Sequence, residues 1–193
     1  MRRLKFLTLL FFPIFSFAQT EFGLKGGLNI SDVVMTNYIN PDVESGLKLK
    51  MGLHAGAFAY GMLNERLGLA GELLYNNKGV KAFDIINLHY ITLPLLVQYK
   101  LTDNIFAELG PEVGYMVSAT SKYGNAGNTY NNKFDLSLDG GFRLDVSKLV
   151  LGVRYCVGVF SVRQPIESID REKIKYQNRV LQLTMGYKLF TLE

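Results

Sequence analysis

"FDLSLDGGFRLDV", residues 134–146, alternates large apolar side chains with charged or small ones. Its charged positions are Asp135, Asp139, Arg143 and Asp145. Because successive side chains of a β-strand point to opposite faces, the four charges share one face and the large apolar side chains share the other. A soluble β-sandwich and a membrane β-barrel both satisfy this pattern with opposite faces turned inward, so the rest of the chain has to decide between them.

The N-terminal stretch "MRRLKFLTLLFFPIFSFAQ" has the composition of a secretory signal. Three cations precede an apolar run over residues 6–17, and small residues before Gln19 have the spacing that signal peptidase cleaves. We expect a signal peptide over residues 1–18 and one mature domain over residues 19–193. The alternative, an uncleaved membrane anchor, is less favoured because the apolar run is short and contains Pro13.

The charge balance of the mature chain is nearly neutral. Residues 1–18 hold three of the 21 basic residues, which leaves 18 basic against 17 acidic side chains. That balance, without a stripe of Lys and Arg, argues against a nucleic-acid partner. Cys156 is the only cysteine, so an intrachain disulfide and a multi-cysteine metal site are excluded. No apolar run long enough for a transmembrane helix follows the signal, so a membrane-spanning form would have to be a β-barrel.

Eight segments of alternating polarity follow, separated by turn-forming residues. They cover residues 21–31, 50–62, 66–77, 89–100, 104–116, 134–146, 149–162 and 177–190. Three short connections (63–65, 101–103 and 147–148) alternate with four long polar ones (about 32–49, 78–86, 118–131 and 163–176). Outer-membrane barrels alternate in this way, with short turns in the periplasm and long loops outside. A soluble antiparallel barrel or sandwich is the alternative.

The glycines favour the membrane barrel. Ten of them share the charged face: Gly23, Gly27, Gly52, Gly56, Gly68, Gly110, Gly114, Gly141, Gly152 and Gly158. The interior of an eight-stranded barrel is only just wide enough for side chains, so glycines there leave room for Arg, Glu and aromatic neighbours. The charged, glycine-rich face is therefore predicted to be the lumen.

Aromatic residues of the apolar face form two bands. Phe22, Tyr99 and Tyr187 fall at the short-turn ends of strands, and Tyr75, Tyr115 and Phe134 at the long-loop ends, whereas Tyr155 lies mid-strand and does not fit. Two such bands are expected where aromatic rings meet both headgroup regions of a bilayer. We predict an all-β fold: an eight-stranded antiparallel up-and-down transmembrane β-barrel with an N-terminal signal peptide.

The lumen is predicted to hold a network of charged side chains. Its members are Glu72, Glu108, Glu112, Asp135, Asp139, Arg143 and Arg154. Unpaired charges at that depth would be very unfavourable, so Arg and carboxylate groups should pair, together with trapped water. A two-residue turn at 147–148 sets Arg143 opposite Gly152 and Arg154 opposite Gly141, with Asp139 diagonal to Arg154 and within its reach. Such a network either plugs the barrel, which we favour, or lines an ion path.

Six stretches resemble a known family: "FGLKGGLNIS", "GLHAGAFA", "ELLYNNKGVK", "HYITLPLLVQYKL", "AELGPEVGYMVSA" and "LQLTMGYKL". They are similar to the PorT-like outer-membrane β-barrel family, which is widespread in Bacteroidetes and so in Gram-negative cells. The resemblance implies an outer-membrane location, and some members of that family support protein export through the type IX secretion apparatus. It also implies that Pro94 and Pro111, which lie within predicted strands, mark bulges or local unpairing.

Catalysis is not expected. His54 and His89 are the only histidines, and neither stands in a hydrolase motif. Glu108 and Glu112 are separated by roughly 13 Å along one strand face, too far for a cooperating acid pair. No His/Cys cluster exists, and "NPDVES" at 40–45 lacks calcium-loop spacing, so we expect no metal and no cofactor.

The function expected from these observations is that of an outer-membrane β-barrel protein with a plugged polar lumen and a structural or interaction role. Its surroundings would be outer-membrane lipid, and a protein partner would contact the loops or periplasmic turns. The Asn- and Gly-rich loop 118–131 suits solvent exposure or, as an alternative, glycan or partner binding. A narrow, porin-like pore for ions or small solutes is the alternative function, and a soluble ligand-binding barrel is the less favoured third.

Overall fold

The computed structural model describes residues 20–36, 49–81, 85–122, 124–125, 133–159, 166–167 and 173–192. The predicted signal peptide over residues 1–18 lies outside the described residues, as do the central parts of the predicted long loops. No helix in the described part of the chain is long and apolar enough to cross a membrane.

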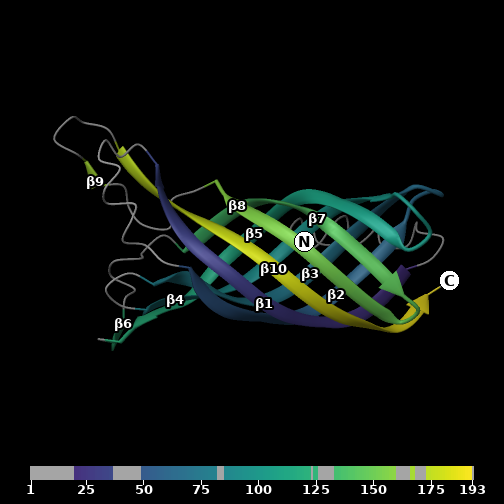
Figure 1. Ribbon diagram of the computed structural model, residues 1–193, viewed down its shortest axis with the longest axis horizontal. Coiled ribbons are helices and arrows are strands. Elements are labelled where there is room, and N and C mark those ends of the chain that lie inside the picture. Colours follow the sequence, from purple (N-terminus) through teal and green to yellow (C-terminus); the bar gives the residue numbers. More distant parts are fainter. Residues whose placement is uncertain are drawn as a thin grey trace, which may run out of the picture.

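Eight long antiparallel strands in the described residues close into a barrel (Figure 1). They are β1 (Thr20–Thr36), β2 (Lys50–Met62), β3 (Leu67–Lys81), β4 (Ile85–Lys100), β5 (Ile105–Ser121), β7 (Phe134–Val146), β8 (Leu149–Gly158) and β10 (Lys173–Leu192). Each pairs with the next, and β10 pairs with β1 to complete the ring. Two short strands, β6 (Gly124–Asn125) and β9 (Ile166–Glu167), pair antiparallel with the long-loop ends of β5 and β10. The predicted eight-stranded up-and-down barrel is confirmed.

Several strands differ in length from the prediction at the long-loop end. β3 continues to Lys81, β4 begins at Ile85 and β5 continues to Ser121, whereas β8 ends at Gly158 rather than at residue 162. The assignment of Lys78 to a loop is therefore wrong, because Lys78 lies within β3 with its side chain fully buried. In the run "NNK" at 76–78, Asn76 and Lys78 are polar because they face a polar lumen.

The three short turns hold the strand register. The β7–β8 turn pairs Gly141 with Arg154 and Arg143 with Gly152, as predicted. Ser147 has a positive φ of 57°, which matches the twist of the flanking strands. In the other two turns a side-chain oxygen accepts a hydrogen bond from a backbone N–H of the same turn. Asn64 Oδ1 accepts from the Leu67 N–H at 2.8 Å, and Thr102 Oγ1 accepts from the Ile105 N–H at 3.1 Å.

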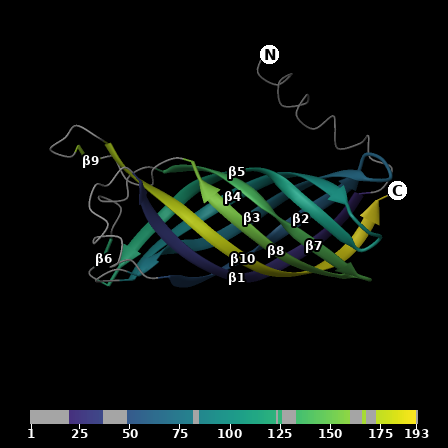
Figure 2. The same ribbon diagram turned by 45° about the horizontal axis from the view of Figure 1, so that its top comes forward.

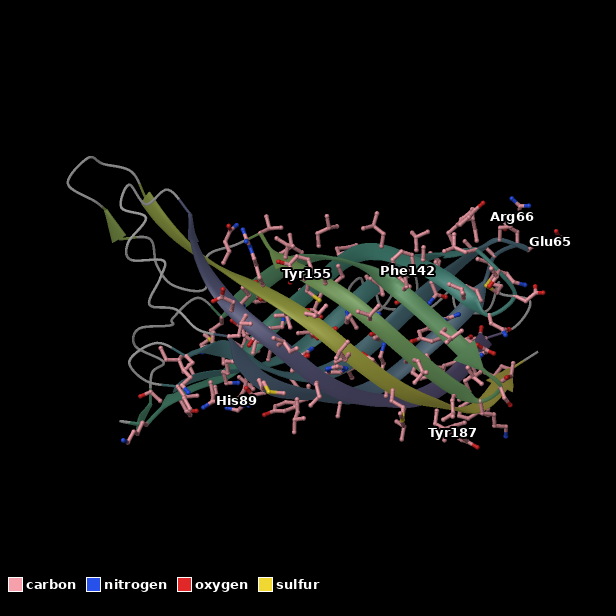
Figure 3. All side chains as sticks on the ribbon, in the orientation of Figure 1. Glu65, Arg66, His89, Phe142, Tyr155 and Tyr187 are labelled. Atoms are coloured by element: carbon pink, nitrogen blue, oxygen red, sulfur yellow. The ribbon has the colours of Figure 1, made fainter. Side chains whose placement is uncertain are left out.

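Most apolar side chains face outward and most polar ones inward, the reverse of a soluble barrel, although some apolar side chains, Phe58, Tyr90 and Leu96 among them, are buried inside. Phe142, Tyr155 and Tyr187 project from the outer wall in Figure 3, with exposed fractions of 55%, 46% and 47%. By contrast, Glu72 and Asp139 are at most 2% exposed. The described polar side chains thus share the interior with a smaller set of apolar ones. Figure 2 shows the wall of tilted strands.

The aromatic side chains at the barrel ends contact one another in pairs. Tyr115 and Phe134 pack edge to face at the long-loop end, with ring centroids 5.4 Å apart. Phe22 stacks on Phe190 at the short-turn end at 5.1 Å. Tyr155 lies on the outer wall between the two bands, as its mid-strand position indicates.

Glycine is required where strands approach an inward-facing position closely. A Cβ at Gly141 would lie 2.2 Å from the Val153 carbonyl oxygen, which is backbone and cannot move aside freely. A Cβ at Gly27 would lie 1.9 Å from the Leu183 carbonyl oxygen. The glycines predicted to make room in the lumen also let the wall itself close tightly.

The two strand prolines mark no bulge. Between Pro94↔Glu112 and Val97↔Leu109 the β4–β5 ladder is interrupted, but the register on either side is unchanged. At Pro111 the β5–β7 pairing continues without a shift. Both prolines show the other alternative, local unpairing: Pro111 lies in this gap of the β4–β5 ladder, and Pro94 lies in a gap of the β3–β4 ladder between Gly71↔Leu95 and Leu74↔Thr92. This is expected for residues without an N–H.

Candidate functional site

The first group of lumen charges lies toward the short turns and is centred on Arg154 of β8. Its guanidinium donates two parallel hydrogen bonds to Glu72 of β3, Nη1 to Oε2 at 3.0 Å and Nη2 to Oε1 at 2.8 Å. In the ring, β3 and β8 stand four strands apart in either direction, so this pair crosses the full width of the lumen. Bidentate geometry between Arg and a carboxylate is the strongest form of this contact.

Each acid of this group contacts two bases. Glu72 Oε1 also accepts from Lys25 Nζ at 2.7 Å. Glu108 Oε2 accepts from Arg154 Nη2 at 2.9 Å, and Glu108 Oε1 lies 4.0 Å from Arg143 Nη1. We call Lys25, Glu72, Glu108, Arg143 and Arg154 the turn-side cluster.

Arg143 connects the turn-side cluster to the barrel mouth. Its guanidinium lies between two aromatic rings, 4.2 Å from the centroid of Tyr60 and 4.1 Å from that of Phe106. Its Nε is 3.0 Å from Asp145 Oδ1, and Asp145 in turn contacts Lys188 at 2.8 Å. A cavity of about 400 Å³ opens at this mouth. Stacking and ion contacts together hold the guanidinium in one orientation.

Above the turn-side cluster lies a layer of uncharged polar groups. His54 Nδ1 is 2.8 Å from Asn29 Oδ1, and His54 Nε2 is 3.0 Å from Thr184 Oγ1. Asn76 Oδ1 accepts from both Asn29 and Gln182, each at 3.1 Å. Four neighbouring strands, β10, β1, β2 and β3, are thereby joined on the lumen side by hydrogen bonds of amide, hydroxyl and imidazole groups.

A second group of charges lies toward the long loops. Lys78 Nζ donates to Glu112 Oε1 at 2.6 Å and is 3.7 Å from Asp135 Oδ2. Asn178 Nδ2 donates to the same Asp135 oxygen at 2.9 Å. We call Lys78, Glu112, Asp135 and Asn178 the loop-side cluster, in which a single base serves two acids.

The predicted pairing of Asp139 with Arg154 is wrong. Asp139 is fully buried, and neither of its carboxylate oxygens has a hydrogen-bond partner among the described residues. It lies opposite Cys156, whose thiol is a weak donor. Arg154 turns instead to Glu72, which can accept both parallel bonds of the guanidinium from the opposite wall.

The structure therefore places the seven predicted lumen residues in three groups. Glu72, Glu108, Arg143 and Arg154 lie in the turn-side cluster, Glu112 and Asp135 in the loop-side cluster, and Asp139 belongs to neither. Sequence reasoning left out the bases Lys25 and Lys78. Lys25 stands on the lumen face between Gly23 and Gly27, a signal that could have found it.

Among the described residues, no group of three or more His, Cys, Asp or Glu side chains is arranged to hold a metal ion. The histidines lie apart: His54 is in the uncharged layer, whereas His89 faces outward and contacts the Tyr75 hydroxyl at 2.6 Å. Figure 3 shows His89 near the long-loop end. The ion pairs and hydrogen bonds of the lumen thus connect strands of the barrel wall to one another.

Comparison with known proteins agrees with this architecture. The family described as "Outer membrane protein beta-barrel domain" matches residues 17–164. Neisserial surface protein A (NspA) is similar over 87% of this chain and 97% of its own, at 11% identity and a TM-score of 0.53. Ail, the attachment invasion locus protein of Yersinia pestis, is similar over 88% and 98%, at 14% identity and a TM-score of 0.48.

OprG, an outer membrane protein from Pseudomonas aeruginosa, is similar over 88% of this chain and 95% of its own, at 15% identity and a TM-score of 0.42. No curated protein matches the chain. The likeness to NspA supports the small-barrel fold.

Proposed function

The chain belongs to the outer membrane protein β-barrel domain family, and we propose that it acts there as a structural or interaction protein whose polar lumen is plugged. Its place is the outer membrane, and lipid surrounds its apolar wall. The observation that carries the proposal is the contact of Arg154 with Glu72 across the lumen. A pair that joins opposite walls obstructs the path along the axis and ties the barrel together.

Conductance of the refolded protein in a planar bilayer tests the plug. We expect no sustained current steps from the wild type and new steps from the double variant Arg154→Ala with Glu72→Ala, which removes the crossing pair. The matched control is Tyr155→Ala, a similar loss of bulk on the outer wall. Current steps of equal size in the wild type and the double variant would contradict the plug.

A narrow pore for ions or small solutes is the second candidate. The cavity of about 400 Å³ at the short-turn mouth, lined in part by Arg143 and Lys188, favours it. If this candidate holds, wild-type current should depend on Arg143, and Arg143→Gln should change the ratio of anion to cation permeability.

The resemblance to the PorT-like family supports a finer proposal, that the barrel contributes to protein export of the type IX kind through a protein partner. The partner would contact the long loops or the short turns. A photo-crosslinking residue at Asn64 or Thr102, in the short turns, would then capture the partner in cells, with Asn125 on the opposite end as the matched position. No protein adduct from either end would argue against an interaction role.

We also propose that the chain is not an enzyme. His54 lies between Asn29 and Thr184 as the histidine of a catalytic triad lies between its orienting group and its nucleophile. The Asn29 amide, however, also donates from Nδ2 to Asn76 Oδ1 and to the Leu53 and Asn77 carbonyls. These contacts fit a structural crosslink. Labelling with an active-site fluorophosphonate is expected to leave Thr184 unmodified, and an adduct there would contradict the proposal.

A further inference from the structure

Two of the short turns lie side by side and enclose a groove on the outside of the barrel. The turn at 63–66 joins β2 to β3, and the turn at 101–104 joins β4 to β5. The Lys100 N–H donates to the Arg66 carbonyl at 2.8 Å, which ties the turns together. The groove has a volume of about 670 Å³ and is lined by Glu65 and Arg66 from the first turn and by residues 99–103 around the second.

The groove presents one base and one acid that form no ion pair with other described residues. The Arg66 guanidinium makes a long contact, 3.5 Å, with the Tyr99 hydroxyl, and neither Arg66 nor Glu65 takes part in a salt bridge in the described part of the chain. Both side chains are exposed, and Figure 3 shows them at the tip of the short-turn end. A second pair, half-buried Lys100 with exposed Asp103 at 2.9 Å, lines the other side.

The membrane side of the groove is apolar. Tyr99 is 42% exposed on the outer wall within the short-turn aromatic band, and Leu67 and Leu101 are 39% and 50% exposed. The groove therefore lies at the boundary where the apolar wall ends and water begins, the depth of lipid headgroups. A ligand that fits it carries charges at one end and hydrocarbon at the other.

We propose that this groove binds the headgroup of a zwitterionic glycerophospholipid that carries both a phosphate and a primary ammonium. Arg66 donates to the phosphate oxygens, because a guanidinium matches phosphate geometry with two parallel bonds. Glu65 accepts from the ammonium, and Leu101 and Tyr99 contact the glycerol and the first methylenes of the acyl chains. Charge complementarity selects the headgroup: an anionic lipid leaves Glu65 without a partner, and a quaternary ammonium has no N–H to donate.

The experiment is native mass spectrometry of the refolded full chain released from mixed micelles containing phosphatidylethanolamine, phosphatidylglycerol or phosphatidylcholine. We expect the wild type to retain phosphatidylethanolamine best, and Arg66→Gln to lower that retention by about two- to fivefold, the range for one exposed charge contact. Lys148→Gln is the matched control, because Lys148 is an exposed cation of the third short turn and does not line the groove. A gel-mobility shift before boiling verifies that each variant is folded.

Two further arms make the outcome decisive. Glu65→Gln is expected to lower retention of phosphatidylethanolamine but not of phosphatidylglycerol. Soluble phosphoethanolamine, added in excess, is expected not to displace the intact lipid. Equal retention of all three lipids, or equal losses in Arg66→Gln and Lys148→Gln, would overturn the proposal. Complete displacement by the soluble headgroup would overturn it too, because the contacts of Leu101 and Tyr99 with the rest of the lipid would then add nothing.

Discussion

The two charged clusters of the lumen are built in opposite ways. In the turn-side cluster each acid contacts two bases, since Glu72 meets Arg154 and Lys25, and Glu108 meets Arg154 and Arg143. In the loop-side cluster one base, Lys78, serves two acids. Loss of one base should therefore be partly compensated on the turn side and uncompensated on the loop side. The number of bases that contact each acid, more than the total number of charges, should decide how much stability each cluster loses when one base is removed.

The largest effect is expected at Lys78. Lys78→Met keeps the length of the side chain but leaves Glu112 and Asp135 without their base, so we expect the free energy of unfolding to fall by about 3–5 kcal/mol. Lys25→Met is the matched change in the turn-side cluster. Because Arg154 still holds Glu72, its loss should be about 1–3 kcal/mol. Urea unfolding in lipid vesicles measures both, and a larger loss for Lys25→Met would show that the turn-side cluster does not compensate for a lost base.

A steric change should disturb the turn-side cluster indirectly. Gly141→Ala places a methyl group 2.2 Å from the Val153 carbonyl oxygen and 2.8 Å from the Arg154 Cα, so β8 must shift at the base of the crossing pair. We expect a loss of about 1–3 kcal/mol. Gly140→Ala is the control, because its methyl group faces the outer wall and comes no closer than 3.5 Å to Leu109 Cδ1. Equal unfolding midpoints for the two variants would contradict the close packing inferred at Gly141.

The smallest effect is expected at Asp139, between the clusters. Asp139→Asn keeps the shape of the side chain and removes a charge that no described base pairs, so the free energy of unfolding should change by less than about 1 kcal/mol or rise slightly. Asp135→Asn, on the same strand and also buried, should lower it by about 1–3 kcal/mol, because Asp135 contacts Lys78 and Asn178. The reverse order would show that Asp139 is the better partnered acid.

The strands of the barrel wall and their register could be predicted from the sequence far better than the contacts between side chains in the lumen. Alternation in residues 134–146 identifies both faces of β7, and the two-residue turn after it sets the β7–β8 register. Both depend on residues close together in the chain. The outward position of Tyr75, Tyr115 and Phe134 follows from the same alternation.

The partners inside the lumen could not be predicted in the same way. Arg154 was expected to reach its neighbour Asp139, but it contacts Glu72 on the opposite wall, 82 residues away in the chain. Which strands face each other depends on how the ring closes, and long side chains can reach past near neighbours to far ones. Lys78 was assigned to a loop because polar residues usually mark loops, a rule that fails where the polar face of a strand is buried.

A double-mutant cycle tests whether Arg154 and Glu72 form a crossing pair that holds the lumen closed. We predict that Arg154→Ala lowers the free energy of unfolding in vesicles by about 2–4 kcal/mol, less than Lys78→Met, since Glu72 and Glu108 lose their shared base but keep Lys25 and Arg143. Adding Glu72→Ala should recover part of that loss, with a coupling energy of about 1–3 kcal/mol. A wild-type midpoint for Arg154→Ala, or strictly additive losses in the double variant, would show that Arg154 and Glu72 do not stabilise each other across the lumen.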